Sequence, residues 1–256
     1  MLTDVRCIWC QKERSVWSVE HPIPEALGNT EITLDVGVCR PCNNKRLAGL
    51  DRALLKPFEL LTVSLGIPRK GGRKPTIDGW RGMRSRWRDG QPELFLNAGP
   101  GDVTTPMGVL KPAKTGILDL KMPDHPIVGE KSTVSIKHEL RFDRKFVRAI
   151  YKCGFELFIF QTNLDIAQAQ AFDKVRLFCL EDEGHISGLA IFREHDLRGV
   201  STYYMEPERP ETSACSFELF GIEFVCDFSA EQTYLDTVER ELAVAGGPTC
   251  HRIPYC

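Results

Sequence analysis

Four cysteines near the start of the chain have the spacing of a metal site. Cys7 and Cys10 form one C-x2-C pair, Cys39 and Cys42 form a second, and 28 residues separate the two pairs. Zinc accepts thiolates in a tetrahedral arrangement, and each pair presents two sulfurs at a suitable separation. Because four thiolates close the coordination sphere, the sequence predicts a structural zinc ion and not a catalytic one. The alternative is four ordinary buried cysteines.

A carboxylate, an imidazole and an amide lie close to these pairs in the sequence. Glu20 and His21 fall between the pairs, and Asn43 directly follows Cys42. We expect zinc to bring Asn43 back towards the strands that carry Glu20 and His21. Oxygen ligands suit a hard divalent ion such as Mg²⁺ or Mn²⁺. A neutral histidine beside such an ion can deprotonate a water molecule for attack on phosphorus.

The order of these motif pieces resembles that of the HNH endonucleases, which have a zinc-knuckle ββα-metal core. The resemblance extends over about residues 5–56 and rests on the two cysteine pairs, Glu20-His21-Pro22-Ile23-Pro24, Leu27-Gly28 and Asn43. It implies a metal-dependent nuclease in which His21 is the general base. It also implies that Glu20 is the acidic ligand of the catalytic ion and that Asn43 replaces the last motif histidine as a ligand.

The chain departs from the family pattern at two positions. The acidic residue of the family is usually Asp, and Glu20 is one methylene longer, so the ion is held either directly or through water. The middle asparagine of the motif, which orients the loop carrying the base, has two candidates here, Asp35 and Asn29. An HNH module that has kept zinc and lost catalysis is the alternative interpretation.

A basic segment with two interleaved tryptophans follows this region. Residues 66–101 are dense in Gly, Pro and Arg with little periodicity, so we expect a loop or linker. Lys and Arg neutralise phosphates, and Trp80 and Trp87 offer stacking surfaces, which favours contact with nucleic acid over a solvated loop. The basic residues are Arg69, Lys70, Arg73, Lys74, Arg81, Arg84, Arg86 and Arg88.

Hydrophobic periodicity predicts both helices and strands elsewhere. Leucines at helical spacing predict a helix over residues 47–54 that Pro57 ends, and the strongest helix is predicted for residues 142–160. Ser229 and Gln232 predict a capping box at the start of a last helix over 230–245. Strands are expected at residues 32–34, 36–38, 103–110, 116–122, 133–139, 174–180, 188–193, 201–205 and 216–228.

One face of the strong helix is basic. It is either a second phosphate track or a partner of the acidic part of the chain. Its residues are Arg141, Lys145, Arg148 and Lys152.

Composition and charge indicate a globular protein with a basic end. The chain has 256 residues, of which 42% are hydrophobic and 27% charged. Residues 1–90 carry 16 Lys and Arg against 10 Asp and Glu, whereas residues 91–256 carry 17 against 25. No apolar run reaches the ~18–20 residues of a membrane span, so no membrane partner is expected. Without an apolar signal segment, the cysteines predict a reduced, cytoplasmic protein.

These observations predict an α+β fold in three parts. The parts are an HNH-type module with a four-cysteine zinc knuckle (1–56), a basic linker or loop (57–101), and an α+β domain for substrate positioning, oligomerisation or partner docking (102–256). The predicted function is a DNA endonuclease with structural Zn and catalytic Mg or Mn, acting in restriction or phage defence. A homo-oligomer or a regulatory protein is a further expected partner. The alternatives are a non-catalytic zinc-containing nucleic-acid-binding module and a nuclease subunit that is silent without a partner.

Overall fold

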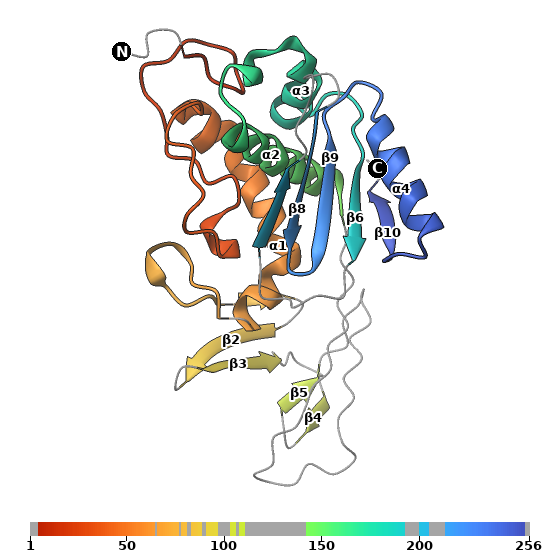
Figure 1. Ribbon diagram of the computed structural model, residues 1–256. Helices are drawn as coiled ribbons and strands as arrows, with labels where there is room; N and C mark the ends of the chain where they lie inside the picture. The colour runs from red at the N-terminus through yellow and green to blue at the C-terminus, as the bar shows by residue number, and fades with distance from the viewer. Residues whose placement is uncertain are drawn as a thin grey trace. The chain divides into compact units, whose positions relative to one another are not determined.

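The chain has mixed α+β structure, as the sequence predicts, and it divides into two compact units (Figure 1). A computed structural model describes residues 5–64, 66–76, 78–80, 83–88, 91–96, 103–105, 108–110, 142–192, 200–204 and 213–253. Residues 1–73 and 142–256 form the first unit, and residues 74–141 form the second. This division differs from the expected boundaries after residues 56 and 101, because the C-terminal helices pack directly on the N-terminal segment.

Two antiparallel segments followed by helices form the N-terminal part of the first unit. Residues 17–20 pair with residues 34–39 through the bridges Trp17–Cys39 and Glu20–Leu34. The predicted strands at 32–34 and 36–38 thus contribute to one segment, and its partner is 17–20. A short 3₁₀ helix, η1 (Glu25–Leu27), lies in the connection, and a π-helix, η2 (Cys42–Leu47), leads into helix α1 (Ala48–Ser64).

Helix α1 continues through Pro57, so the prediction that Pro57 ends it is wrong. A proline inside a helix removes one backbone hydrogen bond. Leu54, Phe58 and Val63 are nevertheless fully buried, and α1 packs along helix α2 (Arg144–Gln161). Burial of these large apolar side chains, about 1.5–3 kcal/mol each, outweighs the lost hydrogen bond.

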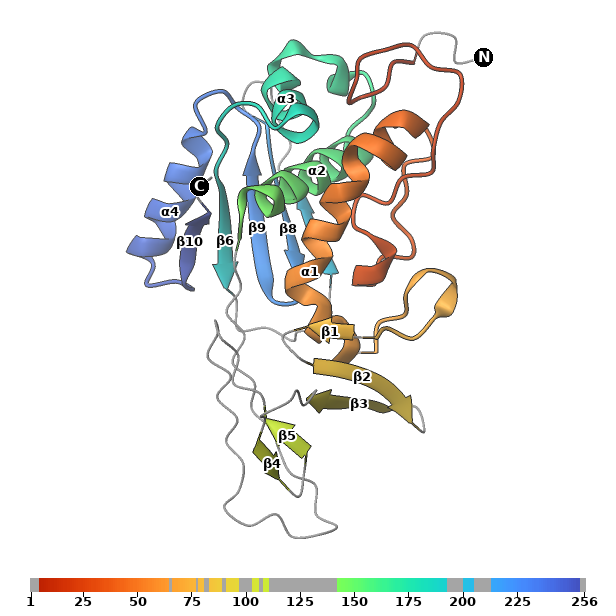
Figure 2. The same ribbon diagram turned by 180° about the vertical axis from the view of Figure 1, so that it is seen from behind.

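A five-stranded antiparallel sheet forms the core of the first unit, with α2 between the sheet and α1 (Figure 2). Helix α2 approaches the sheet closely at Gly154, where a Cβ atom would lie only 2.8 Å from the Sγ atom of Cys226. The strand predicted at 216–228 is a hairpin of two strands. In spatial order the strands are β10 (Cys250–Ile253), β6 (Gly188–Phe192), β9 (Ile222–Asp227), β8 (Ala214–Leu219) and β7 (Val200–Tyr204).

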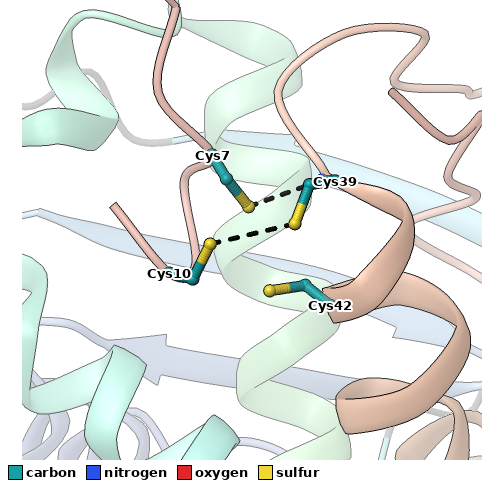
Figure 3. A group of neighbouring side chains, drawn as sticks. All are labelled: Cys7, Cys10, Cys39 and Cys42. Carbon is teal, nitrogen blue, oxygen red and sulfur yellow. Dashed lines mark hydrogen bonds between the residues drawn. The ribbon is translucent and has the colours of Figure 1, made fainter. Parts of the chain in front are cut away.

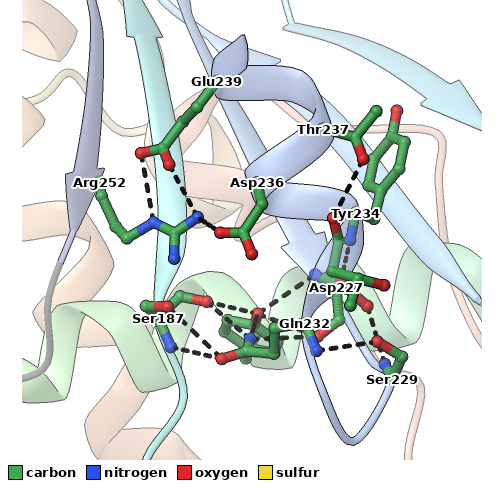
Figure 4. Close-up of polar contacts among 11 residues, drawn as sticks. Ser187, Asp227, Ser229, Gln232, Tyr234, Asp236, Thr237, Glu239 and Arg252 are labelled. Atoms are coloured by element: carbon green, nitrogen blue, oxygen red, sulfur yellow. Dashed lines mark hydrogen bonds and ion pairs between the residues drawn. The ribbon is translucent and has the colours of Figure 1, made fainter.

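Helix α4 (Thr233–Val244) packs against β9, and a polar network fixes its start (Figure 4). The Ser229 hydroxyl accepts a hydrogen bond from the Gln232 backbone N–H at 3.1 Å, but α4 begins at Thr233 with Gln232 as its N-cap, so the capping box predicted at Ser229 is wrong. The Gln232 side chain does not complete the box, because its amide donates to the Tyr151 hydroxyl and the Ser187 carbonyl at 2.8 and 2.9 Å. This network ties α4 to α2 and to the segment before β6.

Helix α3 (Asp173–Glu181) replaces the strand predicted at 174–180. Val175, Phe178 and Cys179 are fully buried, and their i, i+3, i+4 spacing places them on one helical side. Two 3₁₀ helices, η4 (Ile166–Gln168) and η5 (Gln170–Phe172), precede α3. Within the described ranges, no helix is both long and apolar enough to cross a membrane.

The second unit contains two small antiparallel sheets. The loop expected for residues 66–101 is wrong for residues 78–80, 83–88 and 91–96, which form three strands. The predicted strand at 103–110 is a hairpin, and the strands expected at 116–122 and 133–139 lie outside the described residues. The strands are β1 (Asp78–Trp80), β2 (Met83–Arg88), β3 (Gln91–Leu96), β4 (Val103–Thr105) and β5 (Gly108–Leu110).

Candidate active site and zinc centre

The four predicted cysteines come together in one cluster (Figure 3). Their sulfur atoms all lie within 4.8 Å of one another, and the Sγ atoms of Cys10 and Cys39 are 3.8 Å apart. A tetrahedral zinc with Zn–S bonds of about 2.3 Å requires sulfur separations of about 3.8 Å. The hydrogen bond from the Cys42 thiol lowers the pKa of Cys7 and raises that of Cys42, so one sulfur of this pair is favoured as the thiolate that zinc binds. The cluster fits one structural zinc ion.

Asn43 contacts the strand that leads to Glu20 and His21. Its side-chain amide donates hydrogen bonds to the Ser18 hydroxyl at 3.0 Å and to the Val19 carbonyl at 3.3 Å. The Cys42 ligand at the start of η2 places Asn43 there, as the cysteine spacing predicts. Asn43 is half-buried at the rim of the module.

The loop between the two antiparallel segments is braced by Asn29 and not by Asp35. The buried Asn29 amide donates to the Ile23 and Ile32 carbonyls at 2.8 and 2.9 Å, and its oxygen accepts from the Ile32 backbone N–H at 2.9 Å. Asp35 is exposed, and its carboxylate accepts from the Thr33 hydroxyl. Of the two candidates for the middle asparagine of the motif, Asn29 therefore has the bracing geometry.

His21 lies at the surface of the module beside a carboxylate that the sequence reasoning missed. The His21 Nε2 atom is 3.5 Å from the Glu25 Oε1 atom, and 24% of the His21 side chain is exposed. Its Nδ1 atom is buried and has no hydrogen-bond partner in the described part of the chain. No helical spacing indicates this contact in the sequence, because residues 21–24 precede η1 and are not helical.

Glu20 points in the opposite direction, into the protein. Its side chain is only 3% exposed, and its Oε1 atom is 2.5 Å from the Nζ atom of Lys152 on α2. The same ammonium lies 2.9 Å from Asp51 of α1 and 3.2 Å from Glu156 of α2. Glu156 also accepts a hydrogen bond from the indole of Trp9 at 2.8 Å. Glu20, Asp51, Lys152 and Glu156 are called the Lys152 cluster below.

Burial and the neighbouring charges shift the pKa values in the Lys152 cluster in opposite directions. Burial alone would lower the pKa of Lys152, but the carboxylates, with Glu156 foremost, raise it well above the ordinary value. Burial raises the pKa of Glu20 and that of Glu156, and the nearby ammonium only partly offsets this effect. The ammonium is therefore held in its charged form by its neighbours.

This arrangement does not fit a divalent ion bound to Glu20. The Glu20 Oε1 atom already contacts the Lys152 ammonium, so an ion bound to this carboxylate would lie close to a positive charge. At an effective dielectric constant near 20, a dication about 4 Å from a unit positive charge is opposed by about 8 kcal/mol, twice the value for two unit charges. Among the described residues, the four cysteines are the only group of three or more His, Cys, Asp and Glu side chains placed to hold a metal ion.

Two residues of the predicted basic face of α2, Arg148 and Lys152, contact carboxylate or carbonyl groups. Arg148 donates to the Cys179 carbonyl at 2.7 Å and pairs with Asp182 at 2.9 Å, while Lys152 is fully buried. Lys145 is exposed, and Arg141 lies outside the described residues. Of the two alternatives for this face, pairing with acidic residues holds for Arg148 and Lys152.

The predicted nucleic-acid segment is divided between the two units. Arg69 and Arg73 are exposed in the first unit, and Lys74 is exposed in the second. Arg84, Arg86 and Arg88 occupy alternate positions of β2. The structure does not describe Arg81, nor the side chains of Lys70, Arg84, Arg86 and Arg88.

A cleft of about 520 Å³ beside η1 and α1 is rich in basic side chains. Arg52 and Lys56 lie one turn apart on α1, and Arg69, which pairs with Glu59 at 3.8 Å, completes the basic set. Burial raises the pKa of Glu59. Sequence reasoning overlooked Arg52 and Lys56 because they lie outside the dense basic segment.

Residues 7–59 match a protein-family model described as HNH endonuclease. The matched segment contains the zinc cluster, Glu20, His21, Asn29, Asn43 and most of α1. Neither the curated proteins nor the solved structures include a match to this chain.

Proposed function

We propose that this protein is a DNA endonuclease that hydrolyses phosphodiester bonds with His21 as general base, because residues 7–59 match a family model described as HNH endonuclease. The proposal rests mainly on two features, the four-cysteine cluster and the part-exposed His21, which follows the first antiparallel segment. The zinc cluster holds the second segment and η2 together, so the module has a fixed frame beside His21.

In this proposal, His21 takes a proton from a water molecule, and the resulting hydroxide attacks phosphorus. Because Nδ1 is buried, the atom that would accept the proton is Nε2, which Glu25 orients at 3.5 Å. Asn43 holds the strand of His21 through its contacts with Ser18 and Val19. A general base contributes about 10²–10⁴-fold to the rate of such a reaction.

The family resemblance implies a catalytic Mg²⁺ or Mn²⁺ ion on Glu20 and Asn43. Since the Glu20 carboxylate is paired with Lys152, no step of the proposed reaction is assigned to this ion. The cleavage assay therefore includes Mg²⁺, Mn²⁺ and a chelator as separate conditions.

Basic side chains next to the module support nucleic acid as the substrate. The cleft beside η1 carries Arg52, Lys56 and Arg69, and the Lys74–Arg88 segment adds further positive charge. Lys and Arg in such positions bind phosphates and release counterions. We propose DNA as the substrate, restriction or phage defence as the setting, and a reducing cytoplasm as the location.

Plasmid nicking by the zinc-loaded full-length protein tests the proposal. His21→Ala should lower the cleavage rate by about 10²–10⁴-fold and leave zinc content and DNA affinity unchanged. His251→Ala, on the exposed side of β10, is the matched control and should cleave like the wild type. Equal cleavage by His21→Ala and the control would contradict the assignment of the base.

A nuclease subunit that is silent without a partner is the second candidate. The pairing of Glu20 with Lys152 favours it, because the acidic position of the module is occupied by a group of this chain. A regulatory protein or a second copy of the chain would then supply the missing activation. DNA binding without cleavage under any metal condition would favour this candidate.

A further inference from the structure

The Lys152 cluster gathers three carboxylates from three segments around one ammonium. Glu20 comes from the first antiparallel segment, Asp51 from α1 and Glu156 from α2. Lys152 and Glu20 are 132 residues apart in the sequence, and the side chain of Lys152 is only 1% exposed. Three carboxylates thus surround one cation that belongs to the protein itself.

The charged end of the Lys152 side chain is buried within the protein. Its position on α2 lies between the sheet and α1, and of its three carboxylate partners Asp51, at 30% exposed, is the most accessible to solvent. A buried ammonium is stable only while it stays paired, and so are the buried carboxylates of Glu20 and Glu156. The four groups therefore depend on one another.

We propose that the ammonium group of Lys152 is the resident cation of the Glu20 carboxylate and excludes a divalent metal ion from it. The inference rests on the proposed function in one respect, that Glu20 occupies the acidic position of a nuclease module. In this proposal, Lys152 lies outside the segment that matches the family model but balances the charge of the module. Glu20 then acts by holding α2 in place.

Binding of Mn²⁺ to the zinc-loaded full-length protein tests this proposal, with free Mn²⁺ measured by its electron paramagnetic resonance signal. Glu20→Gln keeps the size of the side chain and removes its charge. We expect wild type and Glu20→Gln to have the same Mn²⁺ affinity, or both to bind none. A loss of at least about tenfold in affinity on Glu20→Gln, as expected for removal of a metal ligand, would overturn the proposal.

Removal of the ammonium provides the second arm. Lys152→Gln leaves the three carboxylates without their cation, and the half-exposed Asp51 gives an ion a route to them. We expect Lys152→Gln to bind Mn²⁺ at least about tenfold more tightly than the wild type, and Mn²⁺ to raise its melting temperature. Lys145→Gln, which removes an exposed charge from the same helix, should behave like the wild type.

The possible results of the Mn²⁺ binding experiment on Lys152→Gln are distinct from one another. A folded Lys152→Gln protein that binds no additional Mn²⁺ would show that Lys152 is not what excludes the ion, and would overturn the proposal. If Lys152→Gln does not fold, the comparison of wild type with Glu20→Gln decides alone. A wild type without nuclease activity would remove the proposed function and leave the Mn²⁺ result standing, so the two failures are distinguishable.

Discussion

Replacement of Lys152 by Met should strongly destabilise the protein. The Lys152 side chain is 1% exposed and its partners Glu20 and Glu156 are 3% and 0% exposed, so solvent screens these pairs little. Removal of one partner from a buried ion pair costs about 3–5 kcal/mol, because a charge is left buried without compensation. Asp51, at 30% exposed, should add little, since water can solvate it.

Thermal and urea unfolding at a fixed zinc concentration measure this effect. For a protein of this size, 1 kcal/mol corresponds to about 2–4 °C, so the melting temperature should fall by roughly 6–20 °C. Lys145→Met is the matched control and should change the free energy of unfolding by less than about 0.5 kcal/mol. A Lys152→Met protein within about 1 kcal/mol of this control would refute the buried ion-pair account.

The pH dependence gives a second readout with a defined sign. Burial already raises the folded-state pKa of Glu20 and of Glu156 above 4.5, and loss of the ammonium raises both further. A carboxyl group with a raised folded-state pKa binds more protons in the folded than in the unfolded state. The free energy of unfolding therefore falls as the pH rises above 4.5. The deficit of Lys152→Met relative to wild type should thus be smaller at about pH 5 than at about pH 8.

Three further predictions concern the module and its surroundings. The wild type should contain one zinc ion per chain by metal analysis, and Cys39→Ser should lose it and destabilise the module; a folded module without zinc would contradict this. Asn29→Ala should cost about 1–3 kcal/mol in unfolding experiments, because it leaves buried backbone groups unpaired, whereas the exposed Asp35→Ala should change stability by less than about 0.5 kcal/mol. The double variant Arg52→Ala/Lys56→Ala should reduce the slope of log binding constant against log salt by about 0.9 per lost phosphate contact on duplex DNA, and an unchanged slope would exclude the cleft from the interface.

The four-cysteine cluster could be predicted from the sequence because its signals are local. The two C-x2-C pairs determine which sulfur atoms meet. Asn43 directly follows Cys42, so its position beside the strand follows from the position of that cysteine. Helix α2 was also predictable, since its apolar period extends over five turns. The role of Glu20 could not be predicted, because its partner Lys152 lies 132 residues away and no spacing rule connects the two residues.

Other errors came from patterns with two physical solutions. Lys152 shares a spacing with Arg148 that suggests an exposed basic face, yet it also lies four residues before Glu156 in the most apolar part of the chain. The second pattern indicates a buried i, i+4 pair and was the better signal. The run of apolar residues in α3 suited a strand as well as a helix, and its i, i+3, i+4 spacing was the distinguishing feature.

The distance along the chain between Glu20 and Lys152 has a consequence during protein synthesis. The four cysteines of the cluster, Glu20 and His21 leave the ribosome before Lys152, so zinc can bind to the nascent chain before the second unit has been made. Lys152 is translated 132 residues after Glu20, which takes roughly 7–26 s at about 5–20 residues per second. During that interval the nascent module carries a carboxylate without its ammonium, and the module is complete only after α2 has docked.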